Sequence, residues 1–291
     1  MLIRYRNIFH LSPRINSTFI QFTPTASVNG SIKTENSQHH DFLSLYWSII
    51  RQMKHILILG ANSDVAKQAA KLYITSGDHV TLASRSINEL ADFASRETFG
   101  PKQFDIIYFD AEAFDTHESF YASLPYKPDI VLYAAGYQVE NDRALVDWEA
   151  TFRMMKVLYA GAVSILNIIA MDQSNTALER IIGLSSLSGV RGRKSNFIYG
   201  STKSAFTQYL AGLRQHLHSR NVIVNVVVAG YIRSKMTSHL KLPESLLLEP
   251  EFVARKVFHA GDSFVIVPGF KWKLIYQILK RMPERMVAKL P

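Results

Sequence analysis

Six short apolar runs alternate with helix-like segments between residues 53 and 230, and this alternation constrains the fold more than any other feature. Within each run the apolar residues are consecutive, which indicates a strand buried on both faces of a sheet. The intervening segments carry apolar residues at helical spacing. The pattern predicts an α/β fold, a single doubly wound parallel sheet of the Rossmann type. The runs lie at 55–60, 79–85, 105–110, 128–136, 179–186 and 222–230.

The N-terminal end of the chain differs from this domain, which we place at residues 53–268. Residues 1–52 are rich in Ser, Thr and Asn and show poor periodicity. We expect a poorly structured extension upstream of the domain. The stretch also combines arginines and hydroxyl residues with few acids, so the alternative is a mitochondrial transit peptide. The expected location is therefore the cytoplasm, with peripheral membrane contact open, or the mitochondrion under the second interpretation.

The C-terminal segment, residues 269–291, interleaves apolar residues with lysine and arginine and has Glu284 as its only acid. Trp272, Ile275 and Ile278 follow at spacings of three and so share one helical face. We expect an amphipathic segment whose apolar face lies on an anionic membrane, or packs on the protein's own core or a partner subunit. Peripheral membrane contact and a homodimer are both open at this point.

Composition and charge exclude several kinds of chemistry. The chain has 291 residues, of which 47% are hydrophobic, as in ordinary globular proteins. It has no cysteine, which excludes disulfides, thiolate metal sites and cysteine nucleophiles, and no metal site is expected. The formal net charge of +9 suits a nucleic acid, an anionic membrane or a phosphorylated ligand. Because no helix-turn-helix pattern or aromatic-interleaved basic groove occurs, we expect no nucleic-acid partner.

Gly60 stands where the first apolar run meets the following helix, in "LILGANSDVAKQAA". In such a turn the backbone N–H groups at the helix N-terminus face a pyrophosphate. Asp64 and Ala66 occupy the positions of the usual second and third glycines. We expect Asp64 to cap the helix, because a carboxylate that faced the pyrophosphate would weaken binding.

The spacing Tyr-x-x-x-Lys occurs three times, at Tyr199/Lys203, Tyr231/Lys235 and Tyr276/Lys280. Only the first pair opens the helix after the fifth apolar run. A lysine on the same helix face favours the phenolate form of a tyrosine, whose pKa is about 10 in water. Tyr199 is therefore the candidate for proton exchange with a substrate oxygen.

The motifs occur in a recognisable order: "GANSDVA" after the first run, "AAG" after the fourth, "SSLSG" after the fifth, then "YGSTK", and "AGYIRS" after the sixth. From about residue 53 to 268 the chain resembles the short-chain dehydrogenase/reductase family. The resemblance implies catalytic roles for Tyr199, Lys203 and Ser186, which lies thirteen residues before the tyrosine and would hydrogen-bond the reacting oxygen. It also implies hydride transfer between a nicotinamide cofactor and a ketone or secondary alcohol.

Leu158 departs from the family pattern. It stands where an asparagine normally helps to hold a water molecule that links the lysine to solvent. A leucine cannot hold that water, so we expect a different or slower proton relay. An alternative is therefore a catalytically weak protein that binds NADPH as a sensor, against which the intact Ser186, Tyr199 and Lys203 argue.

The residues after the second run predict the cofactor. NAD enzymes place an acid there to hold the ribose hydroxyls, but this chain has Ser84 and Arg85. An arginine suits a 2′-phosphate, so we expect NADP(H) rather than NAD(H). The resemblance adds Asp110 near adenine, Lys203 at the nicotinamide ribose and Ser234 near the nicotinamide. The predicted cofactor site is Gly60, Asn62, Ser63, Asp64, Val65, Arg85, Asp110, Ala135, Gly136, Tyr199, Lys203, Ile232 and Ser234.

The substrate is the least constrained part of the function. The segment "VIVPGFKWKLIYQILKRMPERMVAKL" is similar to the C-terminal end of reductases that act on decaprenylphosphoryl-2-keto-pentose. Those enzymes also carry an acid in the glycine turn, as Asp64 does here. The similarity implies a sugar or lipid-linked sugar ketone as substrate, and a small soluble carbonyl compound is the alternative.

Overall fold

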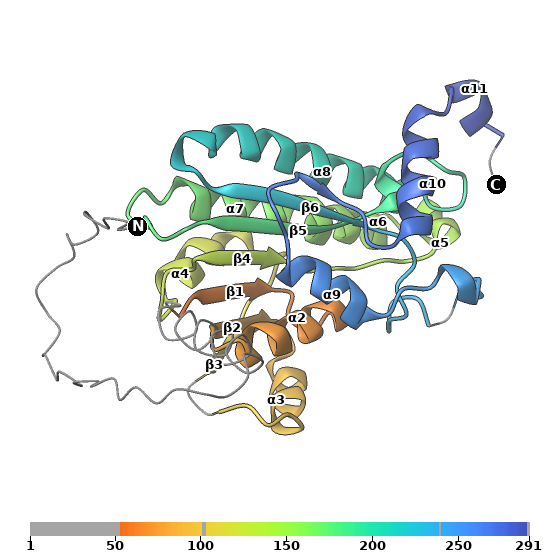
Figure 1. Ribbon diagram of the computed structural model, residues 1–291. Coiled ribbons are helices and arrows are strands. Elements are labelled where there is room, and N and C mark those ends of the chain that lie inside the picture. The colour runs from red at the N-terminus through yellow and green to blue at the C-terminus, as the bar shows by residue number, and fades with distance from the viewer. Residues whose placement is uncertain (1–52, 101–102, 239, 290–291) are drawn as a thin grey trace, which may run out of the picture. The chain divides into compact units, whose positions relative to one another are not determined.

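The structure is a computed structural model that describes residues 53–100, 103–238 and 240–289 (Figure 1). The chain divides into two units, Met1–Arg51 and Gln52–Pro291. The predicted extension at residues 1–52 lies outside the described residues, so both of its interpretations stay predictions.

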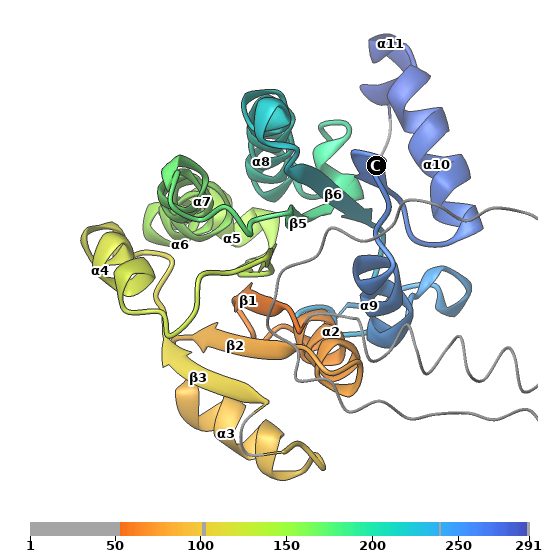
Figure 2. The same cartoon turned by 60° about the vertical axis from the view of Figure 1, so that its left-hand side comes forward.

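Seven parallel strands form one sheet in the order β3-β2-β1-β4-β5-β6-β7. Figure 1 and Figure 2 show the sheet from its edge at β3 to β6. The predicted doubly wound α/β fold is confirmed, and six strands coincide with the six apolar runs. The sequence pattern does not predict β7, which has two residues and pairs only with β6. The strands are β1 (His55–Leu59), β2 (His79–Ser84), β3 (Phe104–Tyr108), β4 (Ile130–Tyr133), β5 (Arg180–Ser186), β6 (Ile223–Ala229) and β7 (Val265–Ile266).

Helices cover both faces of the sheet, and this explains why the strands are apolar throughout. Along β1, Leu57 and Leu59 pack with α4 (His117–Ala122), α7 (Gly161–Met171) and α8 (Phe197–His216) on one face. Ile56 and Ile58 pack with α2 (Asp64–Thr75), α3 (Ile87–Ser95) and α9 (Pro250–Phe258) on the other. The alternation follows from the pleat, which turns successive side chains to opposite faces.

The helix from Trp148 to Met171 runs as α6 (Trp148–Met155), η2 (Lys156–Ala160) and α7. It is preceded by the short α5 (Asn141–Val146). The segment η2 is a π-helical turn, a local widening of the helix that accommodates an extra residue. By length and composition this helix could cross a membrane, but half of its apolar window is buried inside the protein, as in a core helix.

The C-terminal segment forms α10 (Phe270–Arg281) and α11 (Glu284–Val287), and α10 packs on the domain. Trp272 is buried, and its indole N–H donates to the carbonyl oxygen of Leu246 at 2.9 Å. Gly230 makes room for the indole, because a Cβ at that position would lie 2.1 Å from the ring. The segment is therefore tied to the loops that follow β6.

This packing corrects the predicted membrane face of α10. Trp272 is only 5% exposed and Ile275 packs against the core, so these two residues face inward. Ile278 is 48% exposed, and it shares the outer face with Leu274 and Phe270. Of the two expectations for this face, packing on the protein's own core holds for Trp272 and Ile275, and the membrane placement is wrong for them. A spacing of three drifts around a helix, so Ile278 reaches the outer face.

Candidate active site

A cavity of about 340 Å³ lies at the carboxyl ends of β1 and β4. The strands β2 and β3 follow on one side of β1, whereas β4 and the later strands follow on the other side, so the strand order reverses between β1 and β4. Doubly wound sheets bind their ligands at such a switch point. All members of the predicted cofactor set line the cavity: Gly60, Asn62, Ser63, Asp64, Val65, Arg85, Asp110, Ala135, Gly136, Tyr199, Lys203, Ile232 and Ser234.

The turn after β1 brings the backbone close to the neighbouring strand. Gly60 has a φ of 82°, a backbone conformation that residues with a side chain rarely adopt. A Cβ at this position would also lie 2.3 Å from the backbone of Ala135. The N–H groups of Gly60 and Ala61 both donate to the carbonyl oxygen of Ala83 on β2. The residues that follow, from Asn62 to Val65, line the cavity at the start of α2, and the N-terminus of a helix is suited to bind an anion.

Asn62 ties this turn to the end of β2. Its Nδ2 donates to Ser84 Oγ at 2.9 Å and to the carbonyl oxygen of Ser86 at 3.0 Å. Its Oδ1 is buried and accepts no hydrogen bond from the part of the chain that the structure describes. A ribose hydroxyl would supply the missing donor, so the turn fits the adenosine half of a dinucleotide.

Asp64 does not cap α2, contrary to the prediction. The N-cap position belongs to Ser63, and Asp64 is the first residue of the helix. The Asp64 carboxylate instead accepts from the backbone N–H of Lys235 at 2.8 Å, in the loop after β6. The carboxylate is thus engaged across the mouth of the cavity, which the local sequence could not reveal.

Tyr199 and Lys203 lie one turn apart on α8 and both line the cavity. Lys203 is 5% exposed, its Nζ donates to the carbonyl oxygen of Leu184 at 2.8 Å, and it lies 6.0 Å from the centre of the Tyr199 ring. Burial lowers the pKa of Lys203 to about 8 and raises the pKa of Tyr199 to about 12, against the effect of a hydrogen bond with Ser186. The expected phenolate-favouring shift is absent, because burial raises the pKa of the tyrosine by more than the hydrogen bond with Ser186 lowers it.

Ser186 and Ser185 end β5 and point in opposite directions. Ser186 reaches the Tyr199 phenol, and its Oγ also accepts from the backbone N–H of Ser188 at 3.2 Å. Ser186 is absent from the cavity lining, whereas Ser185 belongs to it. The Ser185 hydroxyl is occupied by α8, at 2.8 Å from Thr207 Oγ1. Of the two serines, Ser186 is therefore the one placed beside the tyrosine.

Leu158 lies in the π-helical turn and is completely buried. It forms a small cluster with Ala144 and Met154, and Tyr199 packs against that cluster. An apolar side chain therefore backs the tyrosine where the family pattern has an amide. This arrangement contributes to the burial of the phenol.

The other two Tyr-x-x-x-Lys pairs are arranged differently. Tyr231 packs edge-on against Trp272, with ring centres 5.3 Å apart, and does not line the cavity. Lys235 does line it and forms an ion pair with Glu89, which also pairs with Lys67 at 2.9 Å. Neither Glu89 nor Lys235 is predicted as a cavity residue, because no family motif marks Glu89 and Lys235 follows the last motif residue, Ser234.

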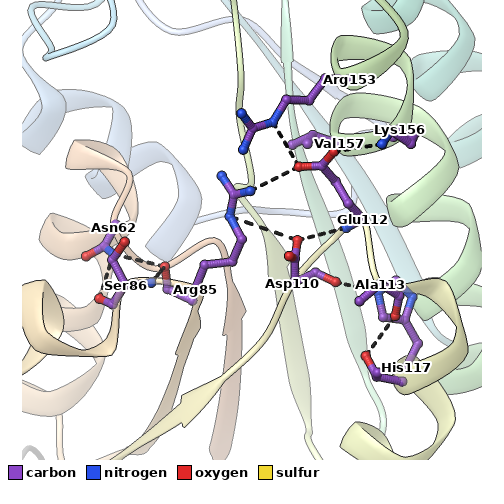
Figure 3. A network of polar contacts seen from close by, with 12 residues as sticks. Asn62, Arg85, Ser86, Asp110, Glu112, Ala113, His117, Arg153, Lys156 and Val157 are labelled. Atoms are coloured by element: carbon purple, nitrogen blue, oxygen red, sulfur yellow. Dashed lines mark hydrogen bonds and ion pairs between the residues drawn. The ribbon is translucent and has the colours of Figure 1, made fainter. Parts of the chain in front are cut away.

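Arg85 leaves β2 and reaches across to the turn after β3 (Figure 3). Its Nη1 donates to Glu112 Oε2 at 3.0 Å, and its Nε lies 3.9 Å from Asp110 Oδ1. Glu112 also binds Arg153 and Lys156 from the long helix. The sequence predicted Arg85 and Asp110 at this end of the cavity but gave no sign of Glu112, which is distant in sequence from its partners.

Within residues 53–100, 103–238 and 240–289, no group of three or more His, Cys, Asp or Glu side chains is arranged to hold a metal ion. The polar groups of the cavity include a phenol, amines, a guanidinium, hydroxyls, an amide and the carboxylates of Asp64, Glu89 and Asp110. They can transfer a proton and bind an anionic dinucleotide.

Comparison with known proteins places this arrangement in context. A family model described as short chain dehydrogenase matches residues 54–245. An uncharacterized oxidoreductase of Mycobacterium tuberculosis is 26% identical over 81% of this chain and 96% of its own length. One from Myxococcus xanthus is 24% identical over 81% and 92%.

Among solved structures, the chain is similar to a short chain dehydrogenase from Burkholderia cenocepacia in complex with NADP. The TM-score is 0.71 at 18% identity, and the match covers 82% of this chain and 98% of the other. At this identity the likeness is one of fold.

Proposed function

The chain belongs to the short-chain dehydrogenase/reductase family and is an oxidoreductase that acts on CH–OH groups; from this premise we propose that it interconverts a ketone and a secondary alcohol with NADP(H). The observation that carries the proposal is that one cavity is lined by Tyr199 and Lys203 together with the glycine turn. A proton-transfer group and a dinucleotide site thus share one space. Such sharing is what hydride transfer coupled to proton transfer requires.

The chain's own residues handle the proton, while NADP(H), when bound, supplies or accepts the hydride. Since the pKa of Tyr199 is raised to about 12, the phenol is protonated at neutral pH and can donate its proton to a carbonyl oxygen. Ser186 donates a hydrogen bond to the same oxygen. With a pKa of about 8, Lys203 is mostly charged at pH 7 and stabilises the phenolate that remains.

NADP(H) is the better fit for the cofactor because of the charges at the end of β2. Arg85 lines the cavity, and the segment from Ser84 to Ser86 contains no acid that would hold a free 2′-hydroxyl. The buried Asn62 Oδ1, which accepts no hydrogen bond from the described residues, supports a ribose nearby. The NADP complex of the similar Burkholderia protein supports the same choice.

A fluorescence titration followed by a turnover assay separates an enzyme from a sensor. Purified protein is first titrated with NADPH. NADPH oxidation is then followed after addition of soluble ketones, one at a time, and of a membrane lipid extract that can supply lipid-linked ketones. Turnover with any ketone supports the proposal. Saturable NADPH binding without turnover of any added substrate would favour the alternative function, an NADPH-binding sensor. The observation that supports this alternative is Leu158 beside Tyr199.

We also propose that the protein binds an anionic membrane surface through the outer face of α10. Phe270, Leu274 and Ile278 are 83%, 55% and 48% exposed and follow one another at spacings of four. Lysine and arginine flank them, and α10 contains no acid. An apolar stripe between cations is typical of helices that lie in the membrane interface.

This placement would favour a ketone carried on a lipid, including a lipid-linked sugar. Trp272 on the inner face of α10 contacts Gly230, just before the loop that lines the cavity with Ile232 and Ser234. A membrane at the outer face of α10 would therefore lie close to the cavity. A soluble carbonyl compound remains the alternative substrate, and the cytoplasm with peripheral membrane contact is the proposed location.

A further inference from the structure

Glu112 binds three cations that come from two separate segments of the chain, one at the end of β2 and two on the long helix. Its Oε2 accepts from Arg85 Nη1 at 3.0 Å and from Arg153 Nε at 2.9 Å, and its Oε1 lies 3.0 Å from Lys156 Nζ. Figure 3 shows the carboxylate between these side chains. Its backbone N–H donates to Asp110 Oδ1 at 3.0 Å, which fixes Glu112 in the turn after β3.

The Glu112 carboxylate is an anion at neutral pH. Burial by itself would raise its pKa, but hydrogen bonds from Lys156 and Arg153 outweigh burial and hold the pKa below its usual value. The side chain is 16% exposed, so water and salt screen its charge less than on the open surface.

Arg85 is the partner that a ligand in the cavity can draw away from Glu112. Arg153 and Lys156 belong to the long helix, and each also lies over an aromatic ring, at 4.7 Å from Tyr137 and 5.2 Å from Phe152. Arg85 instead follows the end of β2 and lines the cavity, which neither Arg153 nor Lys156 does. A new anion at the cavity would therefore move Arg85 first.

We propose that Glu112 is a positioning residue that competes with the 2′-phosphate of the cofactor for Arg85 and so limits the preference for NADP(H) over NAD(H). The inference rests on the proposed function, because it takes the 2′-phosphate to bind at Arg85. Phosphate and carboxylate carry like charges, and both are bound by the same guanidinium donors. Arg153 and Lys156 moderate the competition, because they neutralise the carboxylate and weaken its attraction for Arg85.

The test is a fluorescence titration with NADPH and with NADH, which needs no substrate. Glu112→Gln removes the charge and keeps the size of the side chain. We expect it to bind NADPH about five-fold more tightly, the size of effect that a partly exposed ion pair produces, with NADH affinity within about two-fold of wild type. Glu118→Gln removes the same charge from an exposed site on α4 and is the matched control, which should change neither affinity.

Two further variants test the route through Arg85. Lys156→Gln leaves Glu112 with less neutralisation, so NADPH should bind about two-fold more weakly while NADH is unaffected. In an Arg85→Gln background, neither Glu112→Gln nor Lys156→Gln should change the ratio of the NADPH and NADH affinities. Thermal denaturation checks that each variant folds, and Lys156→Gln provides the test if Glu112→Gln does not.

Three outcomes would overturn the inference. Equal tightening of NADPH and NADH in Glu112→Gln would indicate a general charge effect. Weaker NADPH binding would indicate that Glu112 holds Arg85 in its binding position. A selective effect that persists without Arg85 would exclude the competition. A wild-type protein that binds NADPH no better than NADH would contradict the proposed cofactor itself, and this result is distinct from the other three.

Discussion

At the scale of single residues, burial decides how Tyr199 and Lys203 can act. Burial raises the pKa of the tyrosine to about 12 and lowers the pKa of the lysine to about 8. Both shifts favour the neutral form, because a poorly hydrated site penalises charge. A protonated tyrosine beside Ser186 is the form that can donate a proton to a carbonyl oxygen, as the proposed ketone reduction requires.

Tyr199→Phe should remove the proton donor while keeping the aromatic ring in place. We expect the turnover number for ketone reduction to fall about 100-fold or more, with NADPH affinity close to that of wild type. Steady-state kinetics and a fluorescence titration measure the two effects separately. Tyr231→Phe is the matched control, since Tyr231 packs on Trp272 outside the cavity. Unchanged turnover in Tyr199→Phe would contradict the assignment.

Arg85→Asp should reverse the charge that faces the 2′-phosphate. We expect NADPH to bind at least about ten-fold more weakly and NADH to be favoured in relative terms, because a like charge replaces a bidentate partner. Arg96→Asp makes the same charge change at an exposed position just after α3 and serves as the control. Tighter binding of NADH than of NADPH by the wild-type protein would refute the basis of this prediction.

Residue by residue, the sequence predicts the cavity lining well and its ion pairs poorly. The predicted cofactor residues follow strand ends, and parallel strands bring their carboxyl ends to one edge, so chain order is enough to gather them. The partners of Asp64 and Arg85 come from distant segments, at Lys235 and Glu112. Such contacts depend on side-chain rotamers and on how distant segments pack together, and no short sequence motif predicts them.

At the scale of elements, α10 has an inner face that stabilises the fold and an outer face available for binding. We expect the wild-type protein to sediment with anionic vesicles at low salt and to be released as salt rises. The double variant Phe270→Ser, Leu274→Ser should lose sedimentation and keep its melting temperature, because both side chains are more than half exposed.

The control for this experiment removes apolar surface from another element. Leu145→Ser with Val146→Ser changes two exposed residues of α5 and should leave sedimentation intact. If the wild-type protein stays in the supernatant at every salt concentration, α10 does not bind membranes. A soluble carbonyl compound then becomes the better substrate hypothesis.

The amino end of β2 should make folding sensitive to acid through His79. Burial lowers the pKa of His79, while Asp105 opposes the shift and His55 adds to it; Tyr126 also packs on the ring. The folded state therefore binds a proton at His79 less readily than the unfolded state does. The free energy of unfolding should be highest above about pH 6.5, the pKa of a histidine in the unfolded chain, and should fall as the pH drops below that value.

His79→Gln removes the titrating group and should flatten this decline. Urea denaturation between pH 7 and pH 5 measures the slope of the unfolding free energy, and His216→Gln, on α8, is the control. An equal slope in His79→Gln and wild type would show that His79 does not contribute.

The elements that sequence reasoning missed are those with little pattern to detect. A strand of two residues, β7, has no periodicity of its own and exists because β6 offers its edge. The π-helical turn around Leu158 keeps the apolar pattern of its helix, so composition does not reveal it. Long apolar runs between helices are recognisable because both faces of the sheet are covered.

At the scale of the whole molecule, the strand order determines where chemistry can occur. The sheet extends from β1 to β3 on one side and from β4 to β7 on the other, so the turns after β1 and β4 diverge and leave space between them. The glycine turn, Arg85 and Tyr199 come from distant parts of the chain and reach the same cavity. The alternation of strands and helices in the sequence predicts this topology, whereas the substrate depends on loops whose shape it does not predict.

The folded domain should need residues 53–291 of the chain and not residues 1–52. In the part of the chain that the structure describes, the two large core clusters run from Ile56 to Leu279, and the second unit of the chain begins at Gln52. Since we expect residues 1–52 to be a poorly structured extension, a protein of residues 53–291 should keep a cooperative thermal transition within about 3 °C of the full-length protein and bind NADPH with the same affinity. Differential scanning calorimetry and a fluorescence titration measure these quantities.

Removing residues 270–291 is the informative contrast, because it takes Trp272 and Leu279 out of the core and should lower the melting temperature by more than about 5 °C. If the N-terminal truncation is the more damaging of the two, residues 1–52 contribute to the fold and the domain boundary at Met53 is wrong.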